Sequence, residues 1–515
     1  MVSKLLKIDK FLILILVLAF ATRFVNLGYS DFQGDEIKAL FRPTEDQTTL
    51  DFLLTQRKGP VQFLVTYLLK LVDPTYDNYY LVRFPFAVAG FLAVYFFYRL
   101  VEHHFGKKVA FYASFFFATN GFLIAFSRIV QYQSFVILFM VLALLMFSRK
   151  HIFWGFIFWA ISILSHYDGI FIAPFALYLI YMWFKDNKTQ VKKLVVSAVS
   201  AVALTSAFYI PFIMSITAKT RDYWLGRVTG DVSSKISSSV YLFKVYQPIY
   251  VLQIYLILFV LGLALLAFLL TKPSFPKVKL LQKISIPLKI PLAPSVFVLF
   301  WFLPAFIFLE ALVYIPGTHI YTYIIPALII IAFGVLALEI AIKKLVGLIK
   351  LKFLANYLTV LGIAVVFAFI SAQSYLVFVD HSIEYPWENK PFLFWTLPKP
   401  TPIYHLSIFG FPYNRNWRGI REFASSRPEI TAYTTNERSS IARYHIPLEK
   451  DSTKAGFYVY IRNPQSFTNE IVHSKPAYWV ENNDPDYIYI KDGKEFSKVY
   501  LMTPGELPGA GEAVN

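Results

Sequence analysis

The sequence predicts an all-α polytopic membrane protein with about 11 transmembrane helices, followed by a small mixed α/β extracytoplasmic domain. Two observations lead to this fold class. First, hydrophobic residues make up 57% of the 515 residues and charged residues only 16%, with 52 Phe and 34 Tyr. A soluble protein of this length has no interior large enough to bury so much apolar surface. Second, long apolar runs alternate with loops, and every other loop is rich in Lys and Arg.

The apolar runs define the predicted transmembrane helices. A helix that crosses a bilayer needs roughly 17–25 residues. The predicted helices are 10–28, 80–100, 109–126, 132–148, 152–166, 168–184, 194–214, 248–270, 296–315, 319–341 and 354–378. Because basic loops face the cytoplasm, the N-terminus with Lys4, Lys7 and Lys10 is expected on the cytoplasmic side of the cell membrane. An odd number of crossings then places residues 380–515 outside.

The chain is expected to contain three parts. Residues 1–380 form the membrane domain, 381–412 a Pro-rich linker, and 413–515 a soluble extracytoplasmic domain. The first outer loop, 29–79, contains the apolar run Gly59–Val72, which is too short to span and is expected to lie in the membrane interface. In the last part, the amphipathic and strand-like runs are Trp417–Ser425, Ile430–Thr435, Gly456–Ile461 and Tyr487–Ile490.

Charge and cysteine content limit the functions to consider. The formal net charge is +17 and the chain has no cysteine. In a membrane protein such an excess of basic residues faces anionic lipid, so membrane lipid is the expected partner and nucleic acid is not. The lack of cysteine excludes disulfides, thiolate metal ligands and thiol nucleophiles.

An acidic pair, Asp35 and Glu36, follows a few residues beyond the outer end of the first predicted helix. Ionisable residues at membrane depth or just at its surface are costly and usually face a cavity. A carboxylate held there can deprotonate an acceptor hydroxyl or help to hold a divalent cation. The alternative is a pair of solvated acids on a loop, and the position of the pair leaves both interpretations open.

Three basic residues are predicted at the outer starts of helices. Lys58 opens the presumed interfacial helix, Arg83 begins the second helix and Arg128 precedes the fourth. A phosphate at such a place meets a cation and free backbone N–H groups, and a guanidinium binds it through two hydrogen bonds. Contact with lipid headgroups is the alternative for each. The spacing of Gln131 and Tyr132 from Arg128 is i+3 and i+4, which predicts one shared face of a helix turn.

Two more polar groups are expected on the outer side. His166 and Asp168 lie where two apolar runs meet, and each run is short for a full crossing, so the turn is expected inside a cavity. Asp168 either orients an acceptor or a lysine, or caps the helix that follows. His319 and Tyr321 open the tenth helix and can donate hydrogen bonds to a phosphate or sugar. An interfacial tyrosine belt is the ordinary alternative for the latter.

In this order along the chain, these motifs resemble the GT-C membrane glycosyltransferases, over roughly residues 10–380. The nearest branches are the protein O-mannosyltransferases and the bacterial aminoarabinose and RgtA/B/C/D-like transferases. The motifs are the acidic pair after helix 1, the basic-Pro motif of the interfacial helix, the Arg of helix 2 and the Ser-Arg before helix 4. The resemblance implies an inverting transfer of a sugar from a polyprenyl-phosphate-linked donor to an acceptor hydroxyl. The acceptor would be a glycan, lipid or protein on the outer face.

The resemblance also implies roles for individual residues. By position, Asp35 looks like the general base, and Glu36 helps to orient the acceptor or a cation. A divalent cation at Asp35 and Glu36 is the one cofactor considered. Lys58, Arg83, Arg128 and His319 are expected to stabilise the donor phosphate. The expected substrate-binding residues are Gln131, Tyr132, His166, Asp168 and Tyr321.

Two other classes of function remain as alternatives. A transporter or flippase of lipid-linked sugars would also need a basic cavity and many helices. Transporters commonly have internal repeats and charges at the membrane midplane. No repeat is apparent here and the ionisable residues gather at the outer ends, which favours the enzyme. A membrane-anchored binding protein that acts through residues 380–515 would need far fewer helices.

Overall fold

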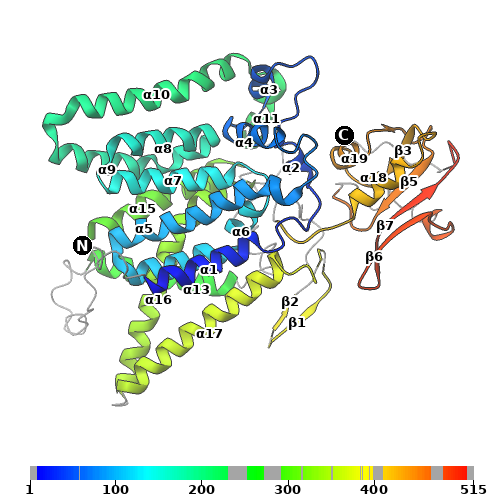
Figure 1. The fold of residues 1–515 in the computed structure, drawn as a ribbon. Coiled ribbons are helices and arrows are strands. Elements are labelled where there is room, and N and C mark those ends of the chain that lie inside the picture. The colour runs from blue at the N-terminus through cyan, green and yellow to red at the C-terminus, as the bar shows by residue number, and fades with distance from the viewer. Residues whose placement is uncertain are drawn as a thin grey trace, which may run out of the picture.

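A helical bundle and a small sheet-containing domain make up the protein (Figure 1). The structure is a computed structural model. It describes residues 9–56, 58–229, 252–271, 292–314, 317–348, 352–382, 384–385, 387–393, 395–397, 410–465 and 479–506. The predicted fold class, a mostly helical membrane protein with a small mixed α/β region, is confirmed in these general terms.

The first half of the bundle contains most of the predicted outer-loop features. Its helices are α1 (Lys10–Phe24), α2 (Gly34–Ile37), α3 (Thr49–Thr55), α4 (Val61–Lys70), α5 (Tyr79–Thr119), α6 (Gly121–Arg128), α7 (Gln133–Ser148) and α8 (Ile152–Ser165). The predicted interfacial run corresponds to α4. The second and third predicted helices are one element, α5, interrupted at Gly106, whose φ of 81° suits glycine.

The second half of the bundle continues from a 3-10 turn. Its helices are η2 (Tyr167–Ile172), α9 (Ala173–Asp186), η3 (Lys188–Gln190), α10 (Val191–Met214), α11 (Ala218–Thr229), α13 (Leu252–Thr271), α15 (Leu292–Ile307), η6 (Phe308–Leu312), η7 (Gly317–Ile320), α16 (Tyr321–Leu348) and α17 (Lys352–Phe378). Glycines allow α13 and α16 to pack closely. A Cβ on Gly262 would lie 1.9 Å from the carbonyl oxygen of Ile330, and one on Gly334 would lie 1.8 Å from that of Leu258.

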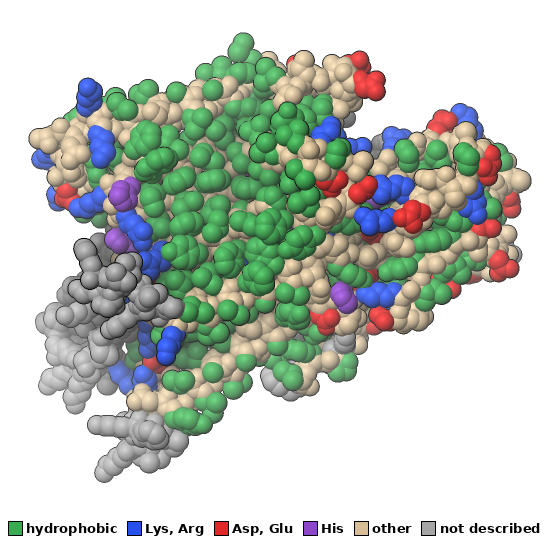
Figure 2. Space-filling model, in the orientation of Figure 1, with side chains coloured by type: hydrophobic (Ala, Val, Ile, Leu, Met, Phe, Trp, Pro, Cys, Tyr) green, Lys and Arg blue, Asp and Glu red, His purple; other side chains and the backbone are tan. Residues whose placement is uncertain are grey.

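Within the described residues, five helices are long and apolar enough to cross a membrane, or six if the bent pair α6–α7 is one span. The expected count of about 11 crossings is therefore not confirmed. Several of the predicted spans are helices shorter than a full crossing, such as α1 with 15 residues and α8 with 14. Figure 2 shows a broad hydrophobic surface over the bundle. Lys and Arg with few acidic side chains lie at the end away from the sheet domain, whereas basic and acidic side chains are mixed on the sheet domain. That asymmetry is what the positive-inside rule expects of a cytoplasmic end.

The small domain is built on a five-stranded sheet in the order β4-β3-β5-β7-β6. β3 lies parallel to β4 and β5, and β7 is antiparallel to β5 and β6. The predicted amphipathic and strand-like runs are confirmed as a helix and three strands; β4 and β7 were not predicted. The elements are α18 (Trp417–Ser425), β3 (Ala432–Thr435), α19 (Ser439–His445), β4 (Glu449–Lys450), β5 (Phe457–Ile461), β6 (Tyr487–Lys491) and β7 (Lys494–Leu501). Within the predicted linker, β1 (Lys390–Phe392) and β2 (Trp395–Leu397) form a short antiparallel hairpin.

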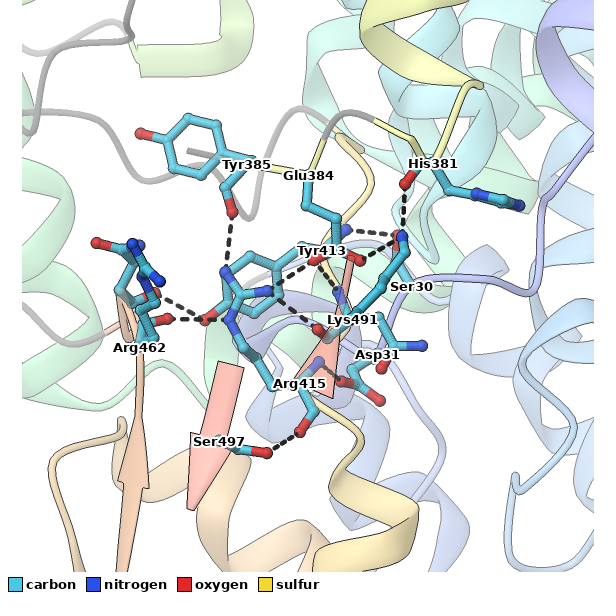
Figure 3. Close-up of polar contacts among 12 residues, drawn as sticks. Ser30, Asp31, His381, Glu384, Tyr385, Tyr413, Arg415, Arg462, Lys491 and Ser497 are labelled. Carbon is cyan, nitrogen blue, oxygen red and sulfur yellow. Dashed lines mark hydrogen bonds and ion pairs between the residues drawn. The ribbon is translucent and has the colours of Figure 1, made fainter. Parts of the chain in front are cut away.

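A buried arginine joins this domain to the loop that follows α1 (Figure 3). Arg415 is fully buried, and its guanidinium donates to the Glu384 carboxylate at 2.8 Å and to the backbone carbonyls of Tyr385 and Arg462, each at 2.9 Å. Its backbone N–H donates to Asp31 Oδ2 at 2.6 Å. Since an unpaired buried charge is costly, these contacts hold the domain in one place against the bundle.

Candidate active site

Glu36 is locked inside the protein by Arg83. The carboxylate is fully buried, and its two oxygens accept from Nε and Nη2 of Arg83, each at 2.8 Å. Oε1 also accepts from the backbone N–H of Val130 at 3.0 Å, and Oε2 from that of Gln33 at 3.1 Å. Gln33 is the N-cap of α2, so Glu36 holds the start of this short helix. Both oxygens are fully engaged, which leaves Glu36 no capacity to orient an acceptor or a cation.

Arg83 is satisfied just as completely. A guanidinium has five N–H donors. The three donors that do not contact Glu36 reach the backbone carbonyls of Leu27, Ser30 and Asp31 at 3.2, 2.8 and 3.0 Å. Arg83 therefore ties the start of α5 to the loop after α1. It has no donor left for the phosphate that the sequence analysis assigned to it.

The Asp35 side chain points away from the Glu36–Arg83 ion pair. Its side chain is 40% exposed, and its Oδ1 lies 3.9 Å from Nη2 of Arg438 in the small domain. Consecutive residues of a helix point about 100° apart, which separates Asp35 from Glu36. The backbone carbonyl of Asp35 accepts from Nε2 of Gln131 at 2.7 Å. The predicted base is thus an accessible carboxylate on a fixed backbone.

Lys58 lies on the other side of the same glutamine. Its Nζ donates to Oε1 of Gln131 at 2.9 Å and lies 5.2 Å from the centre of the Tyr132 ring. Burial lowers the pKa of Lys58 to about 8; Asp35 opposes this shift, and Lys38 adds to it. Gln131 therefore bridges the predicted base and the predicted phosphate ligand. Because Lys58 is partly buried, its ammonium is well suited to pair with an anion.

Arg128 is the last residue of α6, not part of the first turn of α7. The two helices are bent by 115° across residues 129–132. The prediction that Gln131 and Tyr132 share a helix face with Arg128 is therefore wrong, because the helix breaks between them. Nη1 and Nη2 of Arg128 donate instead to three backbone carbonyls at the end of α1, at 2.9–3.2 Å. Carbonyls at a helix C-terminus lack partners within the helix and attract cations.

Arg128 belongs to a group of buried arginines. Arg23 and Arg83 both lie within electrostatic range of it. Arg23 donates to the carbonyls of Ala118 and Phe117 at 3.0 and 3.3 Å, near the end of α5. Among the residues that the structure describes, the ion pair recorded in this group is Arg83–Glu36. The surplus of positive charge favours an anion nearby.

Asp168 is the centre of a second buried cluster. Its Oδ2 accepts from the Tyr321 hydroxyl at 2.8 Å and lies 2.7 Å from His319 Nδ1, and its Oδ1 lies 3.1 Å from His166 Nδ1. Asp168 does not cap the following helix: His166 is the N-cap, and its Nδ1 accepts from the Asp168 N–H at 3.2 Å. The Tyr132 ring stacks on His166 with centroids 4.1 Å apart, which connects this cluster to the Lys58 side.

The same cluster has the composition of a metal site. Ligand atoms of His166, Asp168 and His319 all lie within 4.8 Å of one another. Two imidazole nitrogens and one carboxylate form a common ligand set for catalytic zinc, and imidazole also suits other transition metals. These residues fit a divalent cation better than the predicted pair Asp35 and Glu36, since Glu36 is already fully hydrogen-bonded. Among the described residues, the Asp168 cluster is therefore a better candidate for a cation site than the predicted pair.

One further residue lies at the site, Arg438, which no sequence pattern predicted. It precedes α19 in the small domain and reaches helix α2 across the junction. In the sequence it stands among polar residues, Asn436-Glu437-Arg438-Ser439, with no periodic pattern to single it out. Only the docking of the domain brings it beside Asp35.

Comparisons with known proteins agree with the predicted resemblance. Residues 60–214, from the start of α4 to the end of α10, match the dolichyl-phosphate-mannose-protein mannosyltransferase family. The match confirms the resemblance to membrane glycosyltransferases of the GT-C type. A search among curated proteins found no match.

Two solved structures are similar in outline. The first is ArnT from Cupriavidus metallidurans bound to undecaprenyl phosphate, with 12% identity, a TM-score of 0.47, and coverage of 95% of this chain and 97% of that chain. The second is the oligosaccharyltransferase from Archaeoglobus fulgidus in complex with Zn and sulfate, with 13% identity and a TM-score of 0.46. This similarity covers 95% of the present chain and 73% of the oligosaccharyltransferase chain. Neither similarity assigns a role to any residue of this chain.

Proposed function

We propose that this protein is an inverting glycosyltransferase that moves a sugar from a polyprenyl-phosphate-linked donor to an acceptor hydroxyl at the outer membrane surface. The observation that carries the proposal is the pair Asp35 and Lys58, an accessible carboxylate and a partly buried ammonium held on either side of Gln131. The name of the matched family supports the donor class, a lipid phosphate linked to mannose.

Asp35 acts as the general base. The acceptor hydroxyl attacks the anomeric carbon from the side opposite the phosphate, and its proton passes to the Asp35 carboxylate. The carboxylate is accessible enough to receive a substrate, and its backbone is held by Gln131. A positioned general base typically contributes about 10²–10⁴ in rate.

Lys58 and Arg128 stabilise the leaving group. As the bond from the anomeric carbon to oxygen breaks, negative charge grows on the lipid phosphate. Fixed cations in a poorly hydrated site lower the energy of that state. The buried arginine group around Arg128 has a surplus of positive charge. Lys58 lies near it, because its ammonium donates to Gln131 in the turn that follows Arg128. Arg83 instead holds Glu36 and the loop that positions Asp35.

The Asp168 cluster completes the proposal. His166, His319 and Tyr321 surround Asp168, and the His166 ring stacks on Tyr132, over which the Lys58 ammonium is placed. We assign these residues to the sugar and phosphate of the donor. A divalent cation bound by His166, Asp168 and His319 would supply further positive charge to the phosphate.

A single experiment tests the base. Purified full-length protein is given a panel of polyprenyl-phosphate sugars, and release of polyprenyl phosphate is followed by mass spectrometry. Asp35→Asn should lower release at least about 100-fold. Asp46→Asn, at an exposed acid of the same loop, serves as the matched control and should match the wild type.

The outcome also separates the alternative function. Equal release by the wild type and Asp35→Asn would show that another group is the base. If neither protein consumes any donor and both bind one, a transporter or flippase of lipid-linked sugars becomes the better description, and flipping in reconstituted vesicles would be measured next.

A further inference from the structure

The small domain places an arginine beside the proposed base. Arg438 lies outside the helical bundle in sequence and in fold, yet its Nη2 is 3.9 Å from Oδ1 of Asp35. Both side chains keep access to solvent, with 23% of Arg438 and 40% of Asp35 exposed. An ion pair that served only to dock the domain would be expected to close to hydrogen-bond distance, as Arg415 does with Glu384 at 2.8 Å.

Gly34 makes this approach physically feasible. A Cβ on Gly34 would lie 2.8 Å from Nη1 of Arg438 and 3.2 Å from Oγ of Ser440. Any larger residue before Asp35 would therefore push the guanidinium away. The absence of a side chain at position 34 therefore lets Arg438 approach Asp35 at the edge of the proposed site.

Several cations lie around Asp35 in the described part of the chain. Lys58 lies within electrostatic range of both Asp35 and a second cation, Lys38. Lys450, whose Nζ donates to Ser439 Oγ at 3.1 Å, adds a further cation next to Arg438. A concentration of positive charge at an opening attracts anionic ligands and raises their rate of encounter.

The cations fall on two sides of Asp35. Lys58 belongs to the bundle and packs with Gln131 and Tyr132, where the donor phosphate is proposed to bind. Arg438 comes from the small domain. A hydroxyl that attacks opposite to the leaving phosphate must approach from the side away from Lys58, and Arg438 is the cation that this approach meets.

We infer that Arg438 binds the acceptor, and that the acceptor carries an anionic group, phosphate or carboxylate, close to the hydroxyl that Asp35 deprotonates. The inference rests on the proposed function for the identity of Asp35 as the base. A guanidinium suits such a group because it offers two parallel N–H donors to a phosphate or carboxylate.

Binding without turnover tests this inference. Full-length protein in phosphatidylcholine nanodiscs is first saturated with polyprenyl phosphate to fill the donor site. Mannose 6-phosphate and mannose are then titrated by calorimetry. The wild type should bind the sugar phosphate at least about tenfold more tightly than the neutral sugar. Discs with added phosphatidylglycerol show whether a lipid phosphate competes for the same place.

Variants assign the preference to Arg438. Arg438→Gln should remove the preference for the phosphate, and Arg438→Lys should keep part of it. Gly34→Leu leaves the charge in place but displaces the guanidinium, so it should act like Arg438→Gln. Arg443→Gln, at an exposed position of α19, the helix that Arg438 precedes, should bind like the wild type. Unchanged thermal unfolding shows that each variant is folded.

Equal binding of the two sugars by the wild type, or a preference that survives Arg438→Gln, would overturn the inference. Competition by phosphatidylglycerol alone would assign the anion site to lipid headgroups and would also overturn it as an acceptor site. The proposed function fails independently: loss of polyprenyl phosphate binding, or release of lipid phosphate unaffected by Asp35→Asn, concerns the donor and the base, not Arg438.

Discussion

Two sides of the short helix α2 have opposite environments. Glu36 is fully buried, and each of its oxygens accepts from Arg83 and from a backbone N–H. Asp35 is 40% exposed, with its closest recorded cation 3.9 Å away. A buried carboxylate with all its acceptor positions filled stabilises a loop. An exposed carboxylate among loosely placed cations can still receive a substrate. Adjacent acids of the same charge therefore serve structure and chemistry separately.

The largest expected effect is on stability, from Glu36→Gln. The substitution leaves the buried Arg83 guanidinium without its carboxylate, and breaking a buried pair typically costs about 3–5 kcal/mol. Thermal unfolding in detergent measures the loss. Asp35→Asn should change stability by no more than about 0.5 kcal/mol. Similar stability of Glu36→Gln and the wild type would mean that the Glu36–Arg83 ion pair does not stabilise the fold.

A third carboxyl, Glu437, tests burial without a salt bridge among the described residues. Glu437 Oε1 accepts from the N–H groups of Arg438 and Gln465, each at 2.7 Å, whereas Oε2 is buried with no hydrogen bond in the described part of the chain. Burial raises the pKa of Glu437 to about 7. The folded state thus holds a proton that the unfolded chain has lost, so stability should fall as pH rises from about 4.5 to 7, by up to about 3 kcal/mol.

Comparison of Glu437→Gln with the wild type isolates this effect. The amide does not ionise, so the variant should lose this part of the pH dependence and be the more stable protein above pH 7. Unfolding measured at pH 5 and pH 7.5 gives the two values for each. An identical pH dependence in both proteins would show that Glu437 ionises normally.

Lys58 sharpens the functional side of the comparison. Lys58→Met should reduce release of polyprenyl phosphate about 100-fold, because a fixed cation at the leaving group is lost. Since burial lowers the pKa of Lys58 to about 8, wild-type activity should fall as pH rises through about 8. In Lys58→Arg the fall should move to higher pH, since arginine stays charged. A pH profile unchanged in Lys58→Arg would exclude the lysine as the group that titrates.

The smallest expected effect concerns the buried carboxylate of Asp168. Tyr321→Phe removes one of the donors to Asp168 and leaves His166 and His319 in place. A single lost hydrogen bond of this kind costs about 1 kcal/mol, measured as a shift in thermal unfolding. A loss as large as that expected for Glu36→Gln would show that Tyr321 holds the cluster together.

The site residues show how far local sequence reasoning reaches. The positions of Asp35 and Lys58, after α1 and before α4, left their roles open, and only the family resemblance implied a base and a phosphate ligand. The sequence did not distinguish the structural pair Glu36 and Arg83 from the proposed catalytic residues. An acidic or basic residue looks the same in a sequence whether it faces solvent or an oppositely charged partner. For Arg128 the error came from one unrecognised helix break at residues 129–132.

Composition and hydrophobic pattern alone determined the general class of this protein. Long apolar runs are not soluble in water, which predicts a membrane domain. A short run such as Trp417–Ser425 shows the helical spacing of apolar residues by itself, which predicts a helix. The tertiary structure decided which charges meet. Glu36 finds Arg83, and Asp35 finds Arg438, because the fold closes long loops between residues that share no local pattern. Such pairings depend on burial and distance, which only the packed chain defines.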